Sequence, residues 1–154
     1  MRHKVVVLLI GILMSCTSKP ESEISEPEKI ANSFFRTYAT DGPNKAIRQL
    51  FSANKYISSQ STDTVAIGLE RLSKNLGDYQ GYELIGKKSY GKAISYLSYV
   101  VKYSRQALRF TFECYNPGDG WRLQNFRYET EFLREFDEAV KPHRLKENLE
   151  YEER

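Results

Sequence analysis

A basic start, an apolar stretch and a cysteine open this chain, and together they constrain where it folds. Residues 2–4 read RHK, residues 5–14 form the apolar stretch, and Cys16 follows directly after Ser15. This order is typical of a secretory signal peptide. A membrane-spanning helix needs about 20 apolar residues, so the stretch is too short to cross a bilayer. We therefore expect residues 1–15 to be removed and the remaining chain to fold outside the cytoplasm.

The end of the apolar stretch resembles the lipobox of bacterial lipoproteins. Leu13 and Ser15 occupy the −3 and −1 positions relative to Cys16. The resemblance implies cleavage before Cys16, with diacylglycerol on its thiol and an acyl chain on the new amino group. An ordinary signal peptide is the alternative, and it would leave Cys16 as an odd thiol in an oxidising compartment. Two or three acyl chains give firm anchoring, whereas one gives marginal binding.

The expected location is therefore the bacterial cell envelope, with the chain lipid-anchored to a membrane through Cys16. No Asp follows Cys16, and this favours the outer membrane under the sorting rules of enterobacteria, if the source is Gram-negative. Residues 16–27 are rich in Pro, Ser and Glu and lack an apolar period, so we expect a short flexible tether. The folded domain should then sit close to the membrane.

The size and charge of the mature chain limit the number of domains and the kinds of partner to expect. Removal of residues 1–15 leaves 139 of the 154 residues, enough for one domain with a real core. Arg2 and Lys4 leave with the signal, so 23 basic residues become 21 against 20 acidic ones. This near-neutral balance gives no reason to expect a nucleic-acid partner. If Cys16 is lipidated, Cys114 has no disulfide partner, and its apolar phase predicts a buried, unreactive thiol.

Apolar residues recur every three or four positions in three segments between residues 28 and 76, and this spacing predicts three helices. The first covers 28–39, with Pro27 at its start. The third is expected to have Asp63 as its N-cap and Gly77 at its C-terminal end. The three apolar stripes are Ile30, Ala31, Phe34, Phe35 and Tyr38; Ala46, Ile47, Leu50 and Phe51; and Val65, Leu69, Leu72 and Leu76.

From Tyr79 the pattern changes to alternation, which predicts four strands at 79–90, 93–103, 106–115 and 121–130. Short connections force consecutive strands to pair antiparallel, so the four form a meander. Within 106–115 one face should be buried and the other polar. The buried positions there are Leu108, Phe110, Phe112 and Cys114, and the opposite ones are Arg109, Thr111 and Glu113.

The segment after residue 130 is mostly charged and is expected to form a last helix packed on the sheet. Its apolar contacts would be Phe132, Leu133, Phe136 and Val140. Residues 28–141 then form one α+β domain: N-terminal helices on a curved, about four-stranded antiparallel sheet, followed by a C-terminal helix. Residues 142–154 are expected to be a charged helical tail.

The element order resembles the nuclear-transport-factor-2-like cone fold, in particular its small secreted bacterial domains of uncharacterised function. The paired aromatics Phe34-Phe35 and the strand entry Gly120-Trp121-Arg122-Leu123 carry this resemblance. It implies a curved sheet that wraps the helices and leaves a cavity at its wide end. It also implies a buried Trp121.

Some members of that superfamily are enzymes, such as ketosteroid isomerase and scytalone dehydratase, which place ionisable groups in the cavity. No catalytic residue can be assigned in this chain, because its strand carboxylates and its two histidines fall at unsuitable positions. The chain has no His pair, CxxC motif or Gly-rich phosphate loop, so neither a metal nor another cofactor is expected.

The abundant tyrosines favour binding over catalysis, since Tyr joins an apolar ring to a polar tip. We expect a membrane-anchored, non-catalytic binding or interaction protein whose partner is a small apolar ligand, a peptide or an envelope protein. A small cavity enzyme of the isomerase or dehydratase kind and a structural homodimer are the alternatives. The candidate binding residues are Tyr38, Tyr96, Tyr99 and Tyr103.

Overall fold

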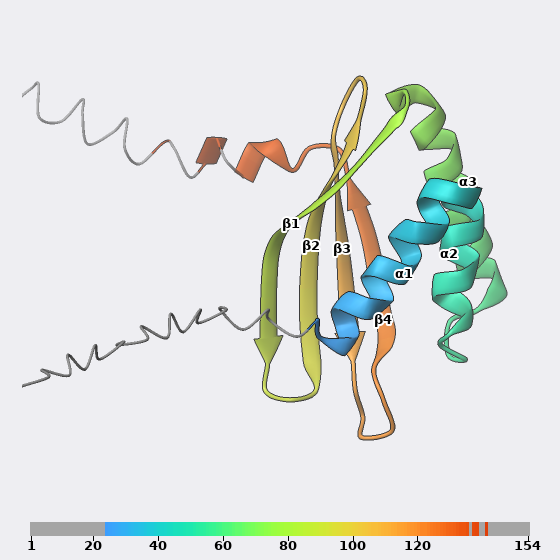
Figure 1. Ribbon diagram of the computed structural model, residues 1–154, viewed down its shortest axis with the longest axis vertical. Coiled ribbons are helices and arrows are strands. Elements are labelled where there is room, and N and C mark those ends of the chain that lie inside the picture. The colour runs from blue at the N-terminus through green and yellow to red at the C-terminus, as the bar shows by residue number, and fades with distance from the viewer. Residues whose placement is uncertain (1–23, 136, 139–140, 142–154) are drawn as a thin grey trace, which may run out of the picture.

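Three helices precede four antiparallel strands in the computed structural model, which describes residues 24–135, 137, 138 and 141. The strands pair in the order β1-β2-β3-β4, so the predicted α+β meander is confirmed (Figure 1). The expected signal peptide, Cys16, most of the tether and the tail at 142–154 lie outside the described residues. The helices are α1 (Glu26–Asp41), α2 (Pro43–Ser52) and α3 (Ser59–Leu76), and the strands are β1 (Tyr79–Tyr90), β2 (Ile94–Tyr103), β3 (Leu108–Tyr115) and β4 (Arg122–Glu129).

Helix α1 begins two residues before the predicted start because Ser25 and Glu28 cap it. The backbone N–H of Ser25 donates to the Glu28 carboxylate at 2.9 Å, as in a capping box. Lys87 of β1 donates to the same carboxylate at 2.5 Å. The first turn of the helix is therefore tied to the edge strand of the sheet.

Helix α3 begins earlier than predicted, and Asp63 is not its N-cap. Ser58 caps the helix by accepting a hydrogen bond from the backbone N–H of Ser61 at 3.1 Å. Asp63 lies one turn further on and pairs with Arg48 of α2 at 2.6 Å. The first turn is polar because it faces solvent, so apolar spacing could not reveal it.

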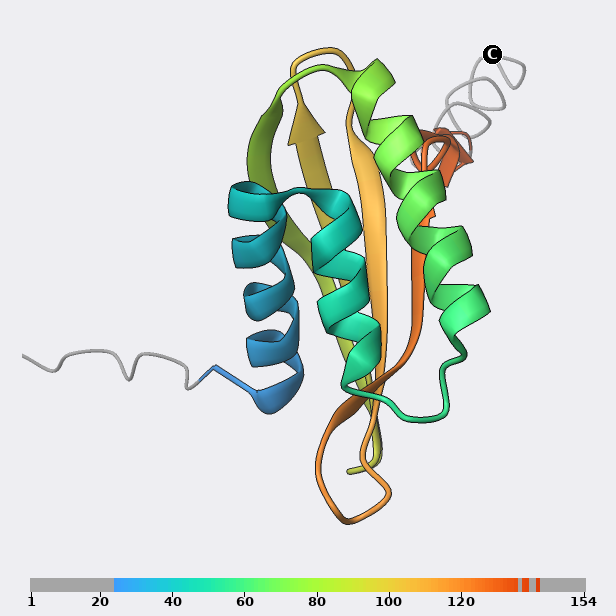
Figure 2. The ribbon, with the colours of Figure 1, turned by 90° about the vertical axis from the view of Figure 1, so that its right-hand side faces the viewer.

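The helices cover one face of the sheet (Figure 2), and aromatic side chains fill the space between them. Phe34 of α1 lies within 5.3–6.0 Å of the rings of Phe110, Phe112 and Phe126, measured between centroids. The predicted inward faces of α2 and β3 are buried as expected, and so is that of α1 except for Ile30, which is partly buried. Cys114 is fully buried, and burial raises the pKa of its thiol to about 12, as expected of an unreactive cysteine.

Two regions differ from the prediction. Trp121 lies just before β4 and is only partly buried against the core, because a loop rather than the strand holds it. The C-terminal segment is helical at residues 133–135, as expected, and Phe132 is buried, but Leu133 is 59% exposed and does not contribute to the core as predicted. Phe136 and Val140 lie outside the described residues. Within the described part, no helix is long and apolar enough to cross a membrane.

Candidate functional site

The four candidate tyrosines lie on two faces of the sheet and form no single surface. Tyr99 and Tyr103 face the helices and are buried, as is Tyr38 on α1. Tyr96 alone lies on the outer face and is partly exposed. The strand alternation explains the division, since Tyr96 is opposite in phase to Tyr99 and Tyr103.

Tyr38 and Tyr103 meet inside the domain, where their hydroxyl groups are hydrogen-bonded to each other. Burial raises the pKa of both phenols, so both stay protonated at neutral pH. Among the described residues, no carboxylate or imidazole is hydrogen-bonded to either hydroxyl. The pair can therefore donate and accept a hydrogen bond but offers no general base.

Tyr99 belongs to the aromatic packing between α1 and the sheet. Its ring lies edge-on to Phe35 at 5.0 Å and to Phe112 at 5.7 Å. Phe35 in turn stacks on Tyr82 of β1 at 3.8 Å. These rings occupy the inner side of the sheet, where the family resemblance implied a cavity, so Tyr99 has a packing role.

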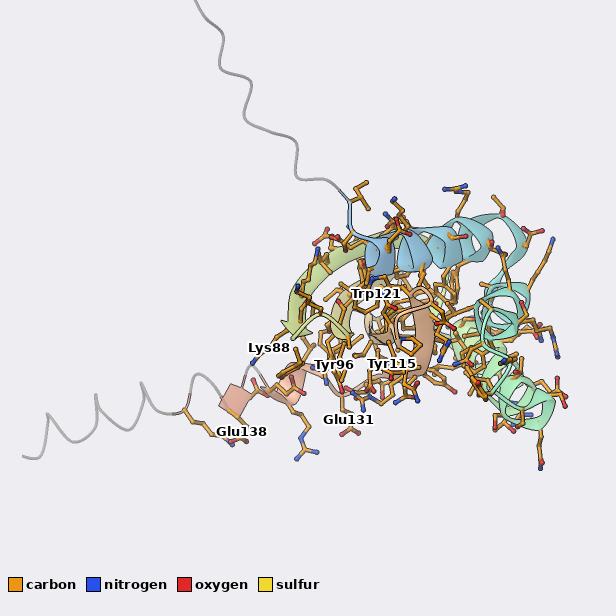
Figure 3. The ribbon with its side chains drawn as sticks, turned by 90° about the horizontal axis from the view of Figure 1, so that it is seen from below. Lys88, Tyr96, Tyr115, Trp121, Glu131 and Glu138 are labelled. Atoms are coloured by element: carbon orange, nitrogen blue, oxygen red, sulfur yellow. The ribbon has the colours of Figure 1, made fainter. Side chains whose placement is uncertain are left out.

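The outer face carries a second group, here called the tyrosine surface: Tyr90, Ile94, Tyr96 and Tyr115. Ile94 pairs with Tyr90 on one side and with Tyr115 on the other, so the group spans three strands. Tyr90 is 52% exposed and Ile94 is 40% exposed. Figure 3 shows Tyr96, Tyr115 and Lys88 on the side of the sheet opposite α1.

Two cations border the tyrosine surface. The Lys88 ammonium lies 5.1 Å from the centroid of the Tyr90 ring, and the Arg122 guanidinium lies 5.7 Å from that of Tyr115. Arg122 also pairs with Asp119, whereas Lys88 has no carboxylate partner among the described residues. Glu113 lies opposite Tyr96 on β3 and is paired with Arg127, so Lys88 is the cation at this surface that no described carboxylate balances. The surface is thus aromatic and partly apolar with one such cation, which suits a partner with apolar and acidic groups.

Sequence reasoning found Tyr96 but missed the other three members of the surface. The pairing register of the β1–β2 hairpin indicates two of these residues, Tyr90 and Ile94. The tight turn after Tyr90 places that residue opposite Ile94, on the same face as Tyr96. The contribution of Tyr115 follows only from the pairing of β2 with β3, which places it opposite Ile94.

An ion-pair cluster lies on the outer face near the start of β3. Arg109 pairs with Glu129 of β4 and with Glu135 of the C-terminal segment. The contact with Glu135 ties the C-terminal segment to the sheet. Within the described ranges, no three His, Cys, Asp or Glu side chains lie close enough to hold a metal ion.

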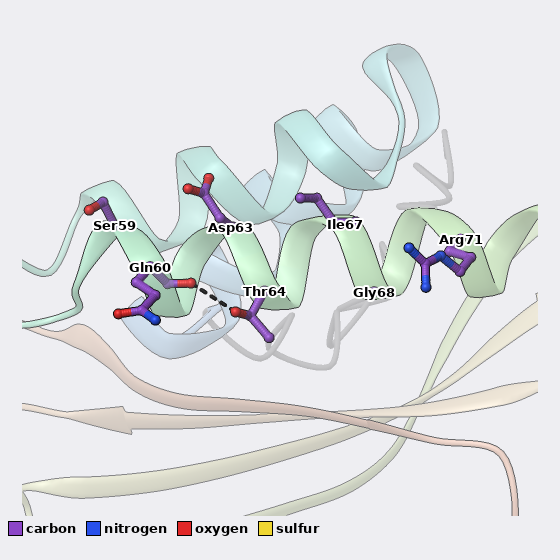
Figure 4. A pocket seen from close by; sticks show the side chains of 7 residues that line it. All are labelled: Ser59, Gln60, Asp63, Thr64, Ile67, Gly68 and Arg71. Atoms are coloured by element: carbon purple, nitrogen blue, oxygen red, sulfur yellow. Dashed lines mark hydrogen bonds between the residues drawn. The ribbon is translucent and has the colours of Figure 1, made fainter.

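A groove of about 470 Å³ runs along α3 (Figure 4). All of its lining residues belong to that one helix, so the groove is an open helix face with no opposing wall. Arg71 is its one cation, and Ile67 is exposed at its centre. We therefore place the candidate site on the tyrosine surface, where side chains from neighbouring strands converge. The groove residues are Ser59, Gln60, Asp63, Thr64, Ile67, Gly68 and Arg71.

No protein-family model matches this chain, and no curated protein matches it either. A crystal structure from Campylobacter jejuni, of a protein named as an NTF2-like transpeptidase, is similar to the chain with a TM-score of 0.48 and 14% identity. The similarity covers 64% of this chain and 97% of the other. The activity in that name belongs to the other protein. The α+β architecture described here follows from the structure itself.

Proposed function

We propose that the chain is a lipid-anchored protein of the bacterial envelope that binds a partner through the tyrosine surface. The domain would be a nuclear-transport-factor-2-like cone whose inner side is filled by packed side chains. The lipobox residues before Cys16 support the anchor. The observation that carries the binding role is the exposed aromatic group on the outer face, bordered by Lys88.

The partner proposed is a peptide or envelope protein that presents apolar and acidic side chains. Tyrosines supply large contact area with few rotatable bonds, and they are enriched at interfaces for that reason. Lys88 is available to meet a carboxylate, because none of the described residues neutralises it. The buried Tyr38–Tyr103 pair supports this choice over a cavity enzyme, since it brings no base to the inner side.

Site-specific photo-crosslinking in intact cells tests the proposal. A photoreactive phenylalanine analogue replaces Tyr96, and a matched control places it at Ile67, an exposed position on α3. We expect a discrete crosslinked species from position 96 and none from position 67, and Lys88→Glu should reduce its yield. A species of twice the protein's mass would identify a homodimer instead. Equal labelling from both positions, or none from position 96, would contradict binding at this surface.

A further inference from the structure

The loops at one end of the domain carry exposed apolar side chains and lysines. Figure 1 shows that the β1–β2 turn, the β3–β4 loop and the start of α1 lie at the same end of the sheet. Figure 2 shows the α2–α3 connection at this end too. We call this region the loop end, and it comprises residues 24–25, 53–58, 91–93 and 116–121.

Exposed apolar and aromatic side chains project from several of these loops. Tyr56 is 72% exposed and Ile24 is 53% exposed. Trp121, the one tryptophan of the chain, is partly buried in the β3–β4 loop. Tyr and Trp are the side chains that favour the headgroup level of a bilayer.

The loop end carries two lysines whose positive charge no described carboxylate neutralises. Lys55 and Lys92 are exposed, and neither has a carboxylate partner among the described residues. Among the described residues, the carboxylates next to these loops are already paired with cations. These pairs are Glu26–Lys29, Glu28–Lys87, Asp63–Arg48 and Asp119–Arg122.

The chain's own covalent order places this end nearest the proposed anchor. Eight residues lead from Cys16 to Ile24, and a fully extended chain spans at most roughly 3.5 Å per residue, or about 28 Å. The twelve residues of β1 carry the sheet roughly 40 Å away from the loop end. The tether is therefore shorter than the sheet, and the loop end is the part of the domain that the anchor holds closest to the membrane.

We propose that the loop end docks on the anionic lipid surface of the membrane that holds the anchor. Tyr56 and Ile24 would enter the headgroup layer, with the partly buried Trp121 beside it, while Lys55 and Lys92 contact lipid phosphates. This inference rests on the proposed lipid anchor. Docking would hold the strands upright from the membrane. Tyr90, Ile94 and Tyr115 flank the docked loops, so the tyrosine surface would face sideways next to the lipid surface.

Trp121 provides the readout, because its emission reports this end of the domain alone. The acylated full chain is purified from membranes and reconstituted into vesicles of brominated phosphatidylcholine, with or without phosphatidylglycerol. We expect bromine to quench Trp121 emission when phosphatidylglycerol is present. The quenching should be largely lost near 1 M salt, where the Debye length is about 3 Å.

Paired charge reversals separate docking from simple proximity. Lys55→Glu with Lys92→Glu should reduce quenching to the level seen in vesicles without phosphatidylglycerol. Arg71→Glu with Arg105→Glu changes the charge equally at the other end of the domain and should leave quenching unchanged. Lys55→Arg with Lys92→Arg should retain it.

The outcomes distinguish this inference from the anchor on which it rests. If the protein is acylated but Trp121 is quenched equally in both vesicle types, or in neither, docking by charge is wrong and the anchor stands. The same holds if both reversal pairs act alike. If mass analysis finds no lipid on the purified chain, the anchor itself fails.

Discussion

The hydroxyl of Tyr38 in α1 is hydrogen-bonded to the hydroxyl of Tyr103 at the end of β2, so a buried polar contact joins the first helix to the sheet. Tyr38→Phe leaves the Tyr103 hydroxyl buried without this partner. We expect a loss of about 1–3 kcal/mol in the free energy of unfolding, the usual cost of an unsatisfied buried group. Urea denaturation of the purified protein measures it.

The double variant provides the control for this prediction. Tyr38→Phe with Tyr103→Phe removes both hydroxyls and keeps both rings, so it should cost less than the two single losses combined. Strictly additive losses would show that the hydroxyl groups do not interact.

Buried phenols also predict sensitivity to alkali. Burial raises the pKa of Tyr79 to about 12, and it raises those of Tyr38, Tyr99 and Tyr103 as well. The folded state thus holds these protons more tightly than the unfolded chain, where the pKa of Tyr is about 10. Their contribution to stability should be full below pH 10 and decline as the pH rises toward 12. Urea midpoints across this range measure the decline, which should be smaller in Tyr79→Phe; a flat profile would contradict it.

The contact between Glu28 and Lys87 predicts the opposite dependence at acid pH. Burial raises the pKa of Glu28, but hydrogen bonds from Lys87 and Ser25 outweigh it and lower the pKa to about 2. The stabilisation is therefore present above pH 4.5 and lost as the pH falls toward 2. Glu28→Gln should cost about 1 kcal/mol at neutral pH, the scale of a partly exposed ion pair, and almost nothing near pH 2.

Glu26→Gln is the matched control, because it removes a carboxylate from the same helical turn but leaves the Lys87 contact intact. A difference between wild type and Glu28→Gln that persists unchanged at pH 2 would show that the carboxylate acts by another route.

Replacing an aromatic residue by Ala should cost more stability in the core than in the β3–β4 loop. Phe34 is buried among five other aromatic rings, and Phe34→Ala should cost about 3–5 kcal/mol. Trp121→Ala should cost clearly less, because Trp121 is only partly buried. Chemical denaturation of the two variants compares them directly. An equal or larger loss for Trp121 would mean that the loop is part of the core.

Periodicity alone predicted most of the architecture because one apolar stripe or face per element packs against the core. The four buried residues of α2 and the alternating face of β3 are clear examples. The polar first turn of α3 carried no such signal, and the bulges of β1 near Gly81 and Gly86 depend on pairing with β2. Trp121 was placed by family resemblance, which does not reveal how deeply a loop residue packs.

The candidate site was harder to predict, since it depends on which strands lie side by side. Strand alternation places Tyr96 on the face opposite Tyr99 and Tyr103, but it does not show which face the helices cover. Tyr115 joins Tyr96 only through the register of β2 and β3. The hydrogen bond between Tyr38 and Tyr103 links residues 65 positions apart, and no local pattern encodes such a contact.

The mass of the mature N-terminal peptide tests the lipid anchor directly, and both the proposed location and the proposed docking of this domain depend on that anchor. Protein from the membrane fraction should yield a peptide that begins at Cys16 and carries diacylglycerol and an acyl chain, and Cys16→Ala should remain unprocessed. A mature chain that begins at another residue, or at an unmodified Cys16, would show that the protein is not anchored through a lipid on Cys16.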